Sequence, residues 1–151
     1  MKTKILVLIT FSFFFSAILK AQCINGVKSY PIYKIGAQLV NDFDNAGNEI
    51  VRIEYDLVFS SKESFRNLSS DWTYSIIGFA DGGVKDLNIK VFEYDDLIEK
   101  WTLVAEDNSS ESYGIVDIRP SVTALYKVEI LVHEFYEGFT VARYGLMYVH
   151  D

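Results

Sequence analysis

Three oxygen-bearing side chains gather around one turn in the second half of the chain. Asp81 opens the turn Asp81-Gly82-Gly83, and Asp86 and Asn88 lie on the segment that leaves it. If that segment is a strand, Asp86 and Asn88 share one face, because strand side chains alternate with a period of two. Calcium binds several oxygen ligands from such positions. These residues therefore form a candidate calcium site; the alternative is that Asp81 forms the turn and the other two face water.

Aromatic side chains are the second group that could bind a ligand. They make up 15% of the residues, and most fall on apolar positions of predicted strands, where they belong to the core. Four of them lie at predicted strand ends or turns: Tyr94, Trp101, Tyr113 and Tyr136. Exposed aromatic residues on a β-protein bind a sugar or a protein partner. Packing in the core or in a hairpin is the alternative role.

Residue patterns that indicate catalysis are sparse. His133 and Glu137 would share one face of a helix, as in part of a zinc motif, but the segment follows a predicted strand and leads into Gly138. It therefore predicts a hairpin turn. No Gly-x-Ser-x-Gly elbow is present, and no set of residues meets the geometric requirements of an active site. We predict a non-enzyme without catalytic residues; a small secreted hydrolase that uses Ser and acidic residues is the alternative.

The N-terminus has the pattern of a secretory signal peptide. Lys2 and Lys4 precede an apolar run from Ile5 to Leu19, and the small residue Ala21 follows. The run is shorter than the roughly 20 apolar residues of a membrane-spanning helix. We predict that residues 1–21 are removed by cleavage near Ala21. The mature protein would then be secreted or periplasmic, with no membrane span.

The single cysteine, Cys23, offers a competing interpretation. A cysteine just after a signal peptide can be the lipid-modified first residue of a lipoprotein, but that processing takes a small residue before the cysteine, and Gln22 occupies this place. Lipoprotein anchoring is therefore the less favoured alternative. One cysteine cannot form an intramolecular disulfide, so stability must come from the core.

Length and charge limit the function further. Cleavage would remove Lys2, Lys4 and Lys20 and no acidic residue, so the net charge would change from −7 to −10. Residues 22–151 are long enough for one domain with a substantial core. An acidic chain of this kind lacks the basic patch needed to bind phosphate backbones, which excludes nucleic acid as a partner.

A period of two dominates the chain after the signal peptide. Between Val51 and Phe59 every second residue is apolar or aromatic, with Arg52, Glu54 and Asp56 between them. This alternation predicts a strand with one buried and one solvated face.

Further segments follow the same pattern. Tyr33–Val40 is predicted to be a strand, and Ser61–Leu68 is the one segment that favours a helical turn or two. Six more strands are predicted at Trp72–Phe79, Asp86–Tyr94 (with Leu87, Ile89 and Val91 facing inward), Trp101–Ala105, Ser112–Ile118, Tyr126–Val132 and Phe139–Val149. About eight short strands separated by turns predict an all-β fold, a jelly-roll-like antiparallel β-sandwich.

Residues 72–148 resemble the bacterial pre-peptidase C-terminal domains, β-sandwich modules carried by secreted peptidases. The matching pieces are Trp72-Thr73-Tyr74-Ser75-Ile76, Asp81-Gly82-Gly83, Asp86-Leu87-Asn88-Ile89-Lys90-Val91-Phe92, Asp107, Pro120, Tyr126-Lys127-Val128-Glu129-Ile130 and Tyr144-Gly145-Leu146. The family usually has Asp-Leu-Asp-Leu where this chain has Asp86-Leu87-Asn88-Ile89, which weakens the transfer of an ion site. The resemblance implies an accessory, non-catalytic module, here without a peptidase.

These observations favour a secreted, non-catalytic β-sandwich module that binds a protein or carbohydrate ligand at or outside the cell surface. Besides the hydrolase, a surface component that self-associates through its edge strands is an alternative.

Overall fold

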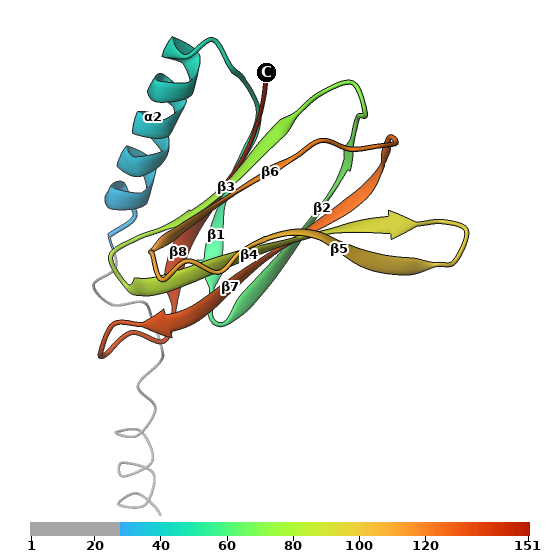
Figure 1. Ribbon diagram of the computed structural model, residues 1–151. Coiled ribbons are helices and arrows are strands. Elements are labelled where there is room, and N and C mark those ends of the chain that lie inside the picture. The colour runs from blue at the N-terminus through green and yellow to red at the C-terminus, as the bar shows by residue number, and fades with distance from the viewer. Residues whose placement is uncertain (1–27) are drawn as a thin grey trace, which may run out of the picture.

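The computed structural model describes residues 28–151. The predicted signal peptide (residues 1–21) and Cys23 lie outside the described residues. Within this range the chain forms a helix followed by eight strands (Figure 1). They are α2 (Tyr30–Asn45), β1 (Glu49–Val58), β2 (Ser61–Leu68), β3 (Tyr74–Ala80), β4 (Val84–Asp95), β5 (Lys100–Asp107), β6 (Tyr113–Ile118), β7 (Ala124–Phe135) and β8 (Ala142–His150). No helix in the described range is long and apolar enough to cross a membrane.

The strands form two four-stranded antiparallel sheets with the orders β1-β8-β3-β6 and β2-β7-β4-β5. This is the strand order of a jelly roll, so the predicted all-β antiparallel sandwich is confirmed. Helix α2 lies against the outer face of the first sheet (Figure 1), which we call the covered sheet. The second sheet, whose outer face has no helix over it, is the open sheet.

The main core lies between the two sheets. It contains apolar residues from the inner faces of both sheets, among them Leu68, Ile76, Leu87, Ile89, Val91, Val128, Ile130 and Leu146. The prediction that Leu87, Ile89 and Val91 face inward is confirmed, since each is 0% exposed. Burial of this set supplies the hydrophobic stabilisation that a chain without disulfides needs.

The strand predicted at Tyr33–Val40 is wrong, because this segment belongs to helix α2. Its buried residues, Ile32 and Gly36, are four apart, and the half-buried Leu39, Val40 and Phe43 continue the same helical face. The alternating residues that suggested a strand are a short run that also fits a helix. Pro31 in the first turn and Gly47 just after the helix, at φ +82°, are helix start and stop signals.

The helical turns favoured for Ser61–Leu68 are also absent. The segment forms β2, which pairs with β7 along its whole length, from Ser61 opposite Leu131 to Leu68 opposite Ala124. Pairing with β7 supplies the hydrogen bonds that override the weak local preference.

The apolar side chains of β1 divide between the two cores. Ile53 and Tyr55 contact the cluster beneath α2, whereas Val51, next to a bulge in the strand register, packs against the main core. The charged side chains of β1 reach strand β2 of the open sheet, where Lys62 Nζ lies 2.8 Å from Asp56 Oδ2 and Ser64 Oγ donates to Glu54 Oε1 at 3.0 Å. The predicted alternation of β1 is confirmed, but both of its faces are partly buried.

Candidate functional site

The outer face of the open sheet carries four aromatic side chains from three strands, which we call the aromatic face. They are Phe65 from β2, Phe92 and Tyr94 from β4, and Trp101 from β5. Phe65 is opposite Lys127, and Lys127 is opposite Phe92 in the strand register. Because paired residues of antiparallel strands point to the same side, these side chains form a row across the sheet.

Trp101 connects the members of this row. Tyr94 is its strand partner, and the two ring centroids are 4.9 Å apart. The centroid of Phe65 lies 5.8 Å from that of Trp101, although two strands separate β2 from β5 in the sheet. Trp101 therefore lies over the sheet surface. Phe65 is 50% exposed and Trp101 36%, so the packed rings remain accessible to solvent.

Lys127 lies beneath these rings and helps to hold them. Its ammonium nitrogen is 4.6 Å from the ring centroid of Phe92 and 5.6 Å from that of Trp101. It also contacts Glu63 Oε1 at 2.9 Å. A cation over an aromatic face contributes about 0.5–2 kcal/mol. The Lys127 side chain is only 17% exposed, so it acts as a support for the aromatic face more than as a contact for a ligand.

A row of charged residues runs beside the aromatic face. Glu63, Glu129, Lys90 and Glu106 are consecutive partners in the register of the four strands. Glu63 lies two residues before Phe65, Lys90 two before Phe92, and Glu129 two after Lys127. Glu106 is separated from the partner of Phe92 by the register shift between Val91 and Phe92. Alternation places these polar groups on the same outer face. The open sheet thus combines flat apolar rings with hydrogen-bonding groups.

Strands β4 and β5 continue beyond the sandwich as an arm (Figure 1). Asp95 Oδ1 accepts hydrogen bonds from the N–H groups of Leu97 and Ile98 at 2.8 and 3.3 Å, which fixes the turn. The tip is apolar and exposed: Leu97 is 94% and Ile98 58% exposed. The exposed pair Leu97 and Ile98 is a second surface suited to binding.

The four predicted aromatic residues do not form one site. Tyr94 and Trp101 meet on the aromatic face. Tyr113 lies on β6, beside an apolar groove of about 360 Å³ between α2 and the covered sheet. Tyr136 lies in the turn that follows β7 and is 51% exposed. The structure therefore separates the predicted set into one pair and two isolated residues.

Sequence reasoning missed Phe65 and Phe92. A signal for Phe92 was present, because Leu87, Ile89 and Val91 were predicted to face inward and their neighbour must then face outward. Phe65 gave no such signal, since its position follows from the pairing of β2 with β7. Contacts between strands distant in sequence bring it to Trp101.

The predicted calcium ligands have hydrogen-bond partners within the protein. Asp81 is 3% exposed, and its carboxylate accepts hydrogen bonds from the N–H groups of Gly83 at 3.0 Å and Arg143 at 3.1 Å. The Asn88 amide nitrogen, in the orientation that satisfies its neighbours, donates to Asp86 Oδ1 at 3.1 Å and to the Ser109 carbonyl at 3.3 Å. Within residues 28–151, no group of three or more His, Cys, Asp or Glu side chains could hold a metal ion. Calcium binding stays a prediction.

The two histidines lie far from any arrangement typical of catalysis. His133 is exposed near the end of β7. The hairpin turn predicted for His133–Glu137 starts later than predicted, because β7 continues to Phe135 and the chain turns at Glu137 and Gly138, the latter at φ +86°. His150 is packed at the end of β8, where its ring stacks on Trp72 with centroids 4.3 Å apart.

No protein-family model and no curated protein sequence matches the chain. Among solved structures, the chain is similar to the pre-peptidase C-terminal domain of a collagenase from Bacillus anthracis, with a TM-score of 0.49 and 9% identity over 64% of this chain and 87% of that one. The sequence resembles the same family.

Two other solved structures are similar. One is a protein from Sulfurospirillum deleyianum, with a TM-score of 0.43 and 10% identity over 66% of this chain and 98% of that one. The other is a CBM4 structure, with a TM-score of 0.41 and 12% identity over 74% of this chain and 83% of that one.

Proposed function

We propose that this protein is a secreted, non-catalytic β-sandwich module that binds neutral polysaccharide through the aromatic face of its open sheet. The observation that carries this proposal is the meeting of the exposed Phe65 and Trp101 with the half-buried Tyr94 in one patch. These residues come from three strands, so the patch is not a by-product of one amphipathic segment.

The chemistry of the face supports a sugar as the ligand. The apolar C–H face of a pyranose ring stacks on a flat aromatic ring, which an exposed Trp or Tyr supplies at low cost in side-chain entropy. The hydroxyl groups at the sugar's edge need hydrogen-bond partners, which the adjoining charged row provides. Stacking and polar contacts lie side by side, as a sugar requires.

The charges on this face favour a neutral sugar. The adjoining row contains three carboxylates, Glu63, Glu129 and Glu106, and one ammonium group, Lys90. Lys127 is already paired with Glu63 at 2.9 Å. A polysaccharide with its own carboxylates or sulfates would be repelled by this excess of negative charge.

The test is retention of the purified protein on insoluble cellulose, chitin and xylan, and in gels that contain soluble neutral glucans. We expect wild type to bind at least one of them and Trp101→Ala to bind at least about tenfold more weakly, the size of loss typical of a central aromatic contact. Tyr136→Ala, an exposed aromatic residue away from the face, is the matched control and should bind like wild type. Retention of Trp101→Ala at the wild-type level, or of wild type on none of these polymers, would reject the proposal.

A protein partner is the second candidate, favoured by the arm. Leu97 and Ile98 are aliphatic and exposed, and such side chains fill protein pockets but offer a sugar no flat stacking surface. If this candidate is correct, Leu97→Ser with Ile98→Ser abolishes binding to a protein partner and leaves polysaccharide retention unchanged.

A further inference from the structure

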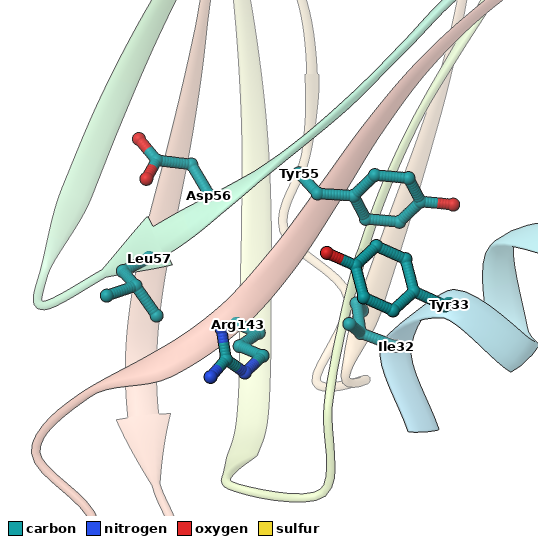
Figure 2. A pocket seen from close by; sticks show the side chains of 6 residues that line it. All are labelled: Ile32, Tyr33, Tyr55, Asp56, Leu57 and Arg143. Carbon is teal, nitrogen blue, oxygen red and sulfur yellow. The ribbon is translucent and has the colours of Figure 1, made fainter. Parts of the chain in front are cut away.

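A small hollow opens between the first turn of α2 and strands β1 and β8, on the outer face of the covered sheet (Figure 2). Its volume is about 170 Å³, and it is lined by Ile32, Tyr33, Tyr55, Asp56, Leu57 and Arg143. The two tyrosine rings stand on one side, with centroids 4.8 Å apart, and Arg143 lies across the hollow from them (Figure 2). The aromatic face belongs to the other sheet, so the hollow is separate from it.

The guanidinium group of Arg143 lacks a partner within the described part of the chain. It forms no ion pair there, and its Nε is a buried nitrogen without a hydrogen-bond acceptor. The one carboxylate that lines the hollow, Asp56, is paired with Lys62 at 2.8 Å. A buried N–H donor without an acceptor destabilises the free protein, so an explanation for its presence is needed.

The backbone of Arg143 is held in place by its neighbours. Its backbone N–H donates to the buried Asp81 carboxylate at 3.1 Å, and its strand partner is Leu57. The hydroxyl group of Tyr33 points toward the middle of the hollow, whereas that of Tyr55 points away from Arg143 toward α2, where it packs against Gly36 (Figure 2). The Tyr33 hydroxyl has no hydrogen-bond partner among the described residues. One cation and one free hydroxyl donor thus line a hollow large enough for a few heavy atoms.

We propose that this hollow binds the carboxylate group of a small organic ligand. A guanidinium group offers two parallel N–H donors that match the two oxygens of a carboxylate. The Nη groups of Arg143 meet the carboxylate first. A turn of the guanidinium then brings Nε–H to the second oxygen and gives that donor the acceptor it lacks. The Tyr33 hydroxyl group donates to a remaining lone pair or to a hydroxyl group next to the carboxylate.

The proposal is tested by titrating the purified protein with sodium acetate, sodium glucuronate and uncharged glucose while the amide NMR signals are followed. We expect glucuronate to shift the signals of residues around Tyr33, Tyr55 and Arg143, and glucose to leave them in place. Shifts with acetate as well would identify the carboxylate alone as the ligand; shifts with glucuronate only would identify a sugar acid. No shift with either acid contradicts the proposal.

Variants link the effect to Arg143. Arg143→Gln should weaken glucuronate binding about tenfold or more, the loss expected when a charge-assisted pair is removed. Lys34→Gln, the same loss of charge at an exposed position of α2, is the matched control and should leave the affinity unchanged. Equal affinity in wild type and Arg143→Gln would overturn the assignment.

A stability measurement separates binding from folding defects. Arg143→Met removes the unsatisfied N–H, so the free protein should melt at the same temperature as wild type or higher, as is common when a binding residue is replaced. A strong loss of stability in Arg143→Met would mean that Arg143 is a structural residue, against the proposal. Trp101→Ala should leave glucuronate binding intact, so this hollow and the polysaccharide face can fail independently.

Discussion

On the covered sheet, the outward-facing Ile77, Phe79 and Met147 lie beneath α2 and are at most 2% exposed, whereas on the open sheet the outward-facing Phe65 and Trp101 are 50% and 36% exposed. Both outer faces carry large apolar side chains. One has a partner within the chain and the other has none.

This difference in burial shows which of the two apolar surfaces stabilises the fold. Residues under α2 form a second core cluster with Ile32 and Val149, and burial of this kind stabilises the native state. The aromatic face obtains little burial of this kind, because its rings pack mainly on each other and on Lys127. An exposed apolar patch of this kind marks a binding surface in a soluble protein. The predictions that follow test this contrast.

The largest effect is expected from a matched pair of phenylalanines. Phe79→Ala should lower the free energy of unfolding by about 3–5 kcal/mol, because it leaves a cavity in a packed cluster. Phe65→Ala should cost about 1 kcal/mol or less, because half of the side chain is already in water. Denaturant unfolding monitored by circular dichroism measures both.

Equal losses for Phe79→Ala and Phe65→Ala would contradict the contrast between the two faces. It would mean that the aromatic face is as much a part of the core as the cluster beneath the helix.

Asp81 provides the next largest effect. Asp81→Ala removes a buried acceptor of two backbone hydrogen bonds, from Gly83 and Arg143, and should cost about 1–3 kcal/mol. Melting curves of wild type in calcium and in chelator extend the test. Because both carboxylate oxygens already have donors, we expect the two curves to coincide; a higher melting temperature in calcium would establish the ion site that the sequence suggested.

Alkaline pH tests the burial between the two sheets. Burial, together with the negative charges of Asp56 and Glu54, raises the pKa of Tyr144 to about 12. Burial likewise raises the pKa of Tyr148 to about 12. Below pH 10, the ordinary tyrosine value, both folded and unfolded states keep the phenol protons, so the contribution to stability is complete. Between pH 10 and 12 the unfolded chain loses these protons first.

The free energy of unfolding should therefore fall as the pH rises through this range. Denaturant titrations at several pH values measure the slope, which should be smaller in Tyr148→Phe. A slope that is the same in wild type and in Tyr148→Phe would show that this phenol is accessible to water in the native state.

The smallest effect concerns the support of the aromatic face. Lys127→Met keeps the aliphatic length but removes the ammonium group that contacts Phe92, Trp101 and Glu63. We expect a loss of about 1 kcal/mol or less, as for a partly exposed cation–π contact and ion pair. A loss of several kcal/mol would mean that the open sheet depends on this lysine for folding.

Most of the fold could be predicted from sequence because a half-buried β-strand has a local pattern of alternating apolar and polar residues. The period of two from Val51 to Phe59 and the inward Leu87, Ile89 and Val91 correspond to β1 and β4. The error at Tyr33–Val40 has a physical cause. Over eight residues, apolar side chains at alternate positions fit a strand, and only the wider spacing from Ile32 to Phe43 identifies the helix.

The candidate site could be predicted only in part. Tyr94 and Trp101 were identified because both flank one hairpin, which is a local feature. Phe65 reaches Trp101 through the order β2-β7-β4-β5, and no local pattern encodes which strands become neighbours. The hollow at Arg143 depends in the same way on the packing of α2 against β1 and β8.

The fluorescence of Trp101 tests the central claim most directly. The chain has two tryptophans, so in Trp72→Phe the emission comes from Trp101 alone. When this variant is titrated with a polysaccharide that retains the wild-type protein, we predict a change in Trp101 emission that saturates with binding and that persists when Tyr136 is also replaced by Ala. Saturable binding with unchanged Trp101 emission would show that the ligand lies elsewhere and would contradict the assignment of the aromatic face as the binding site.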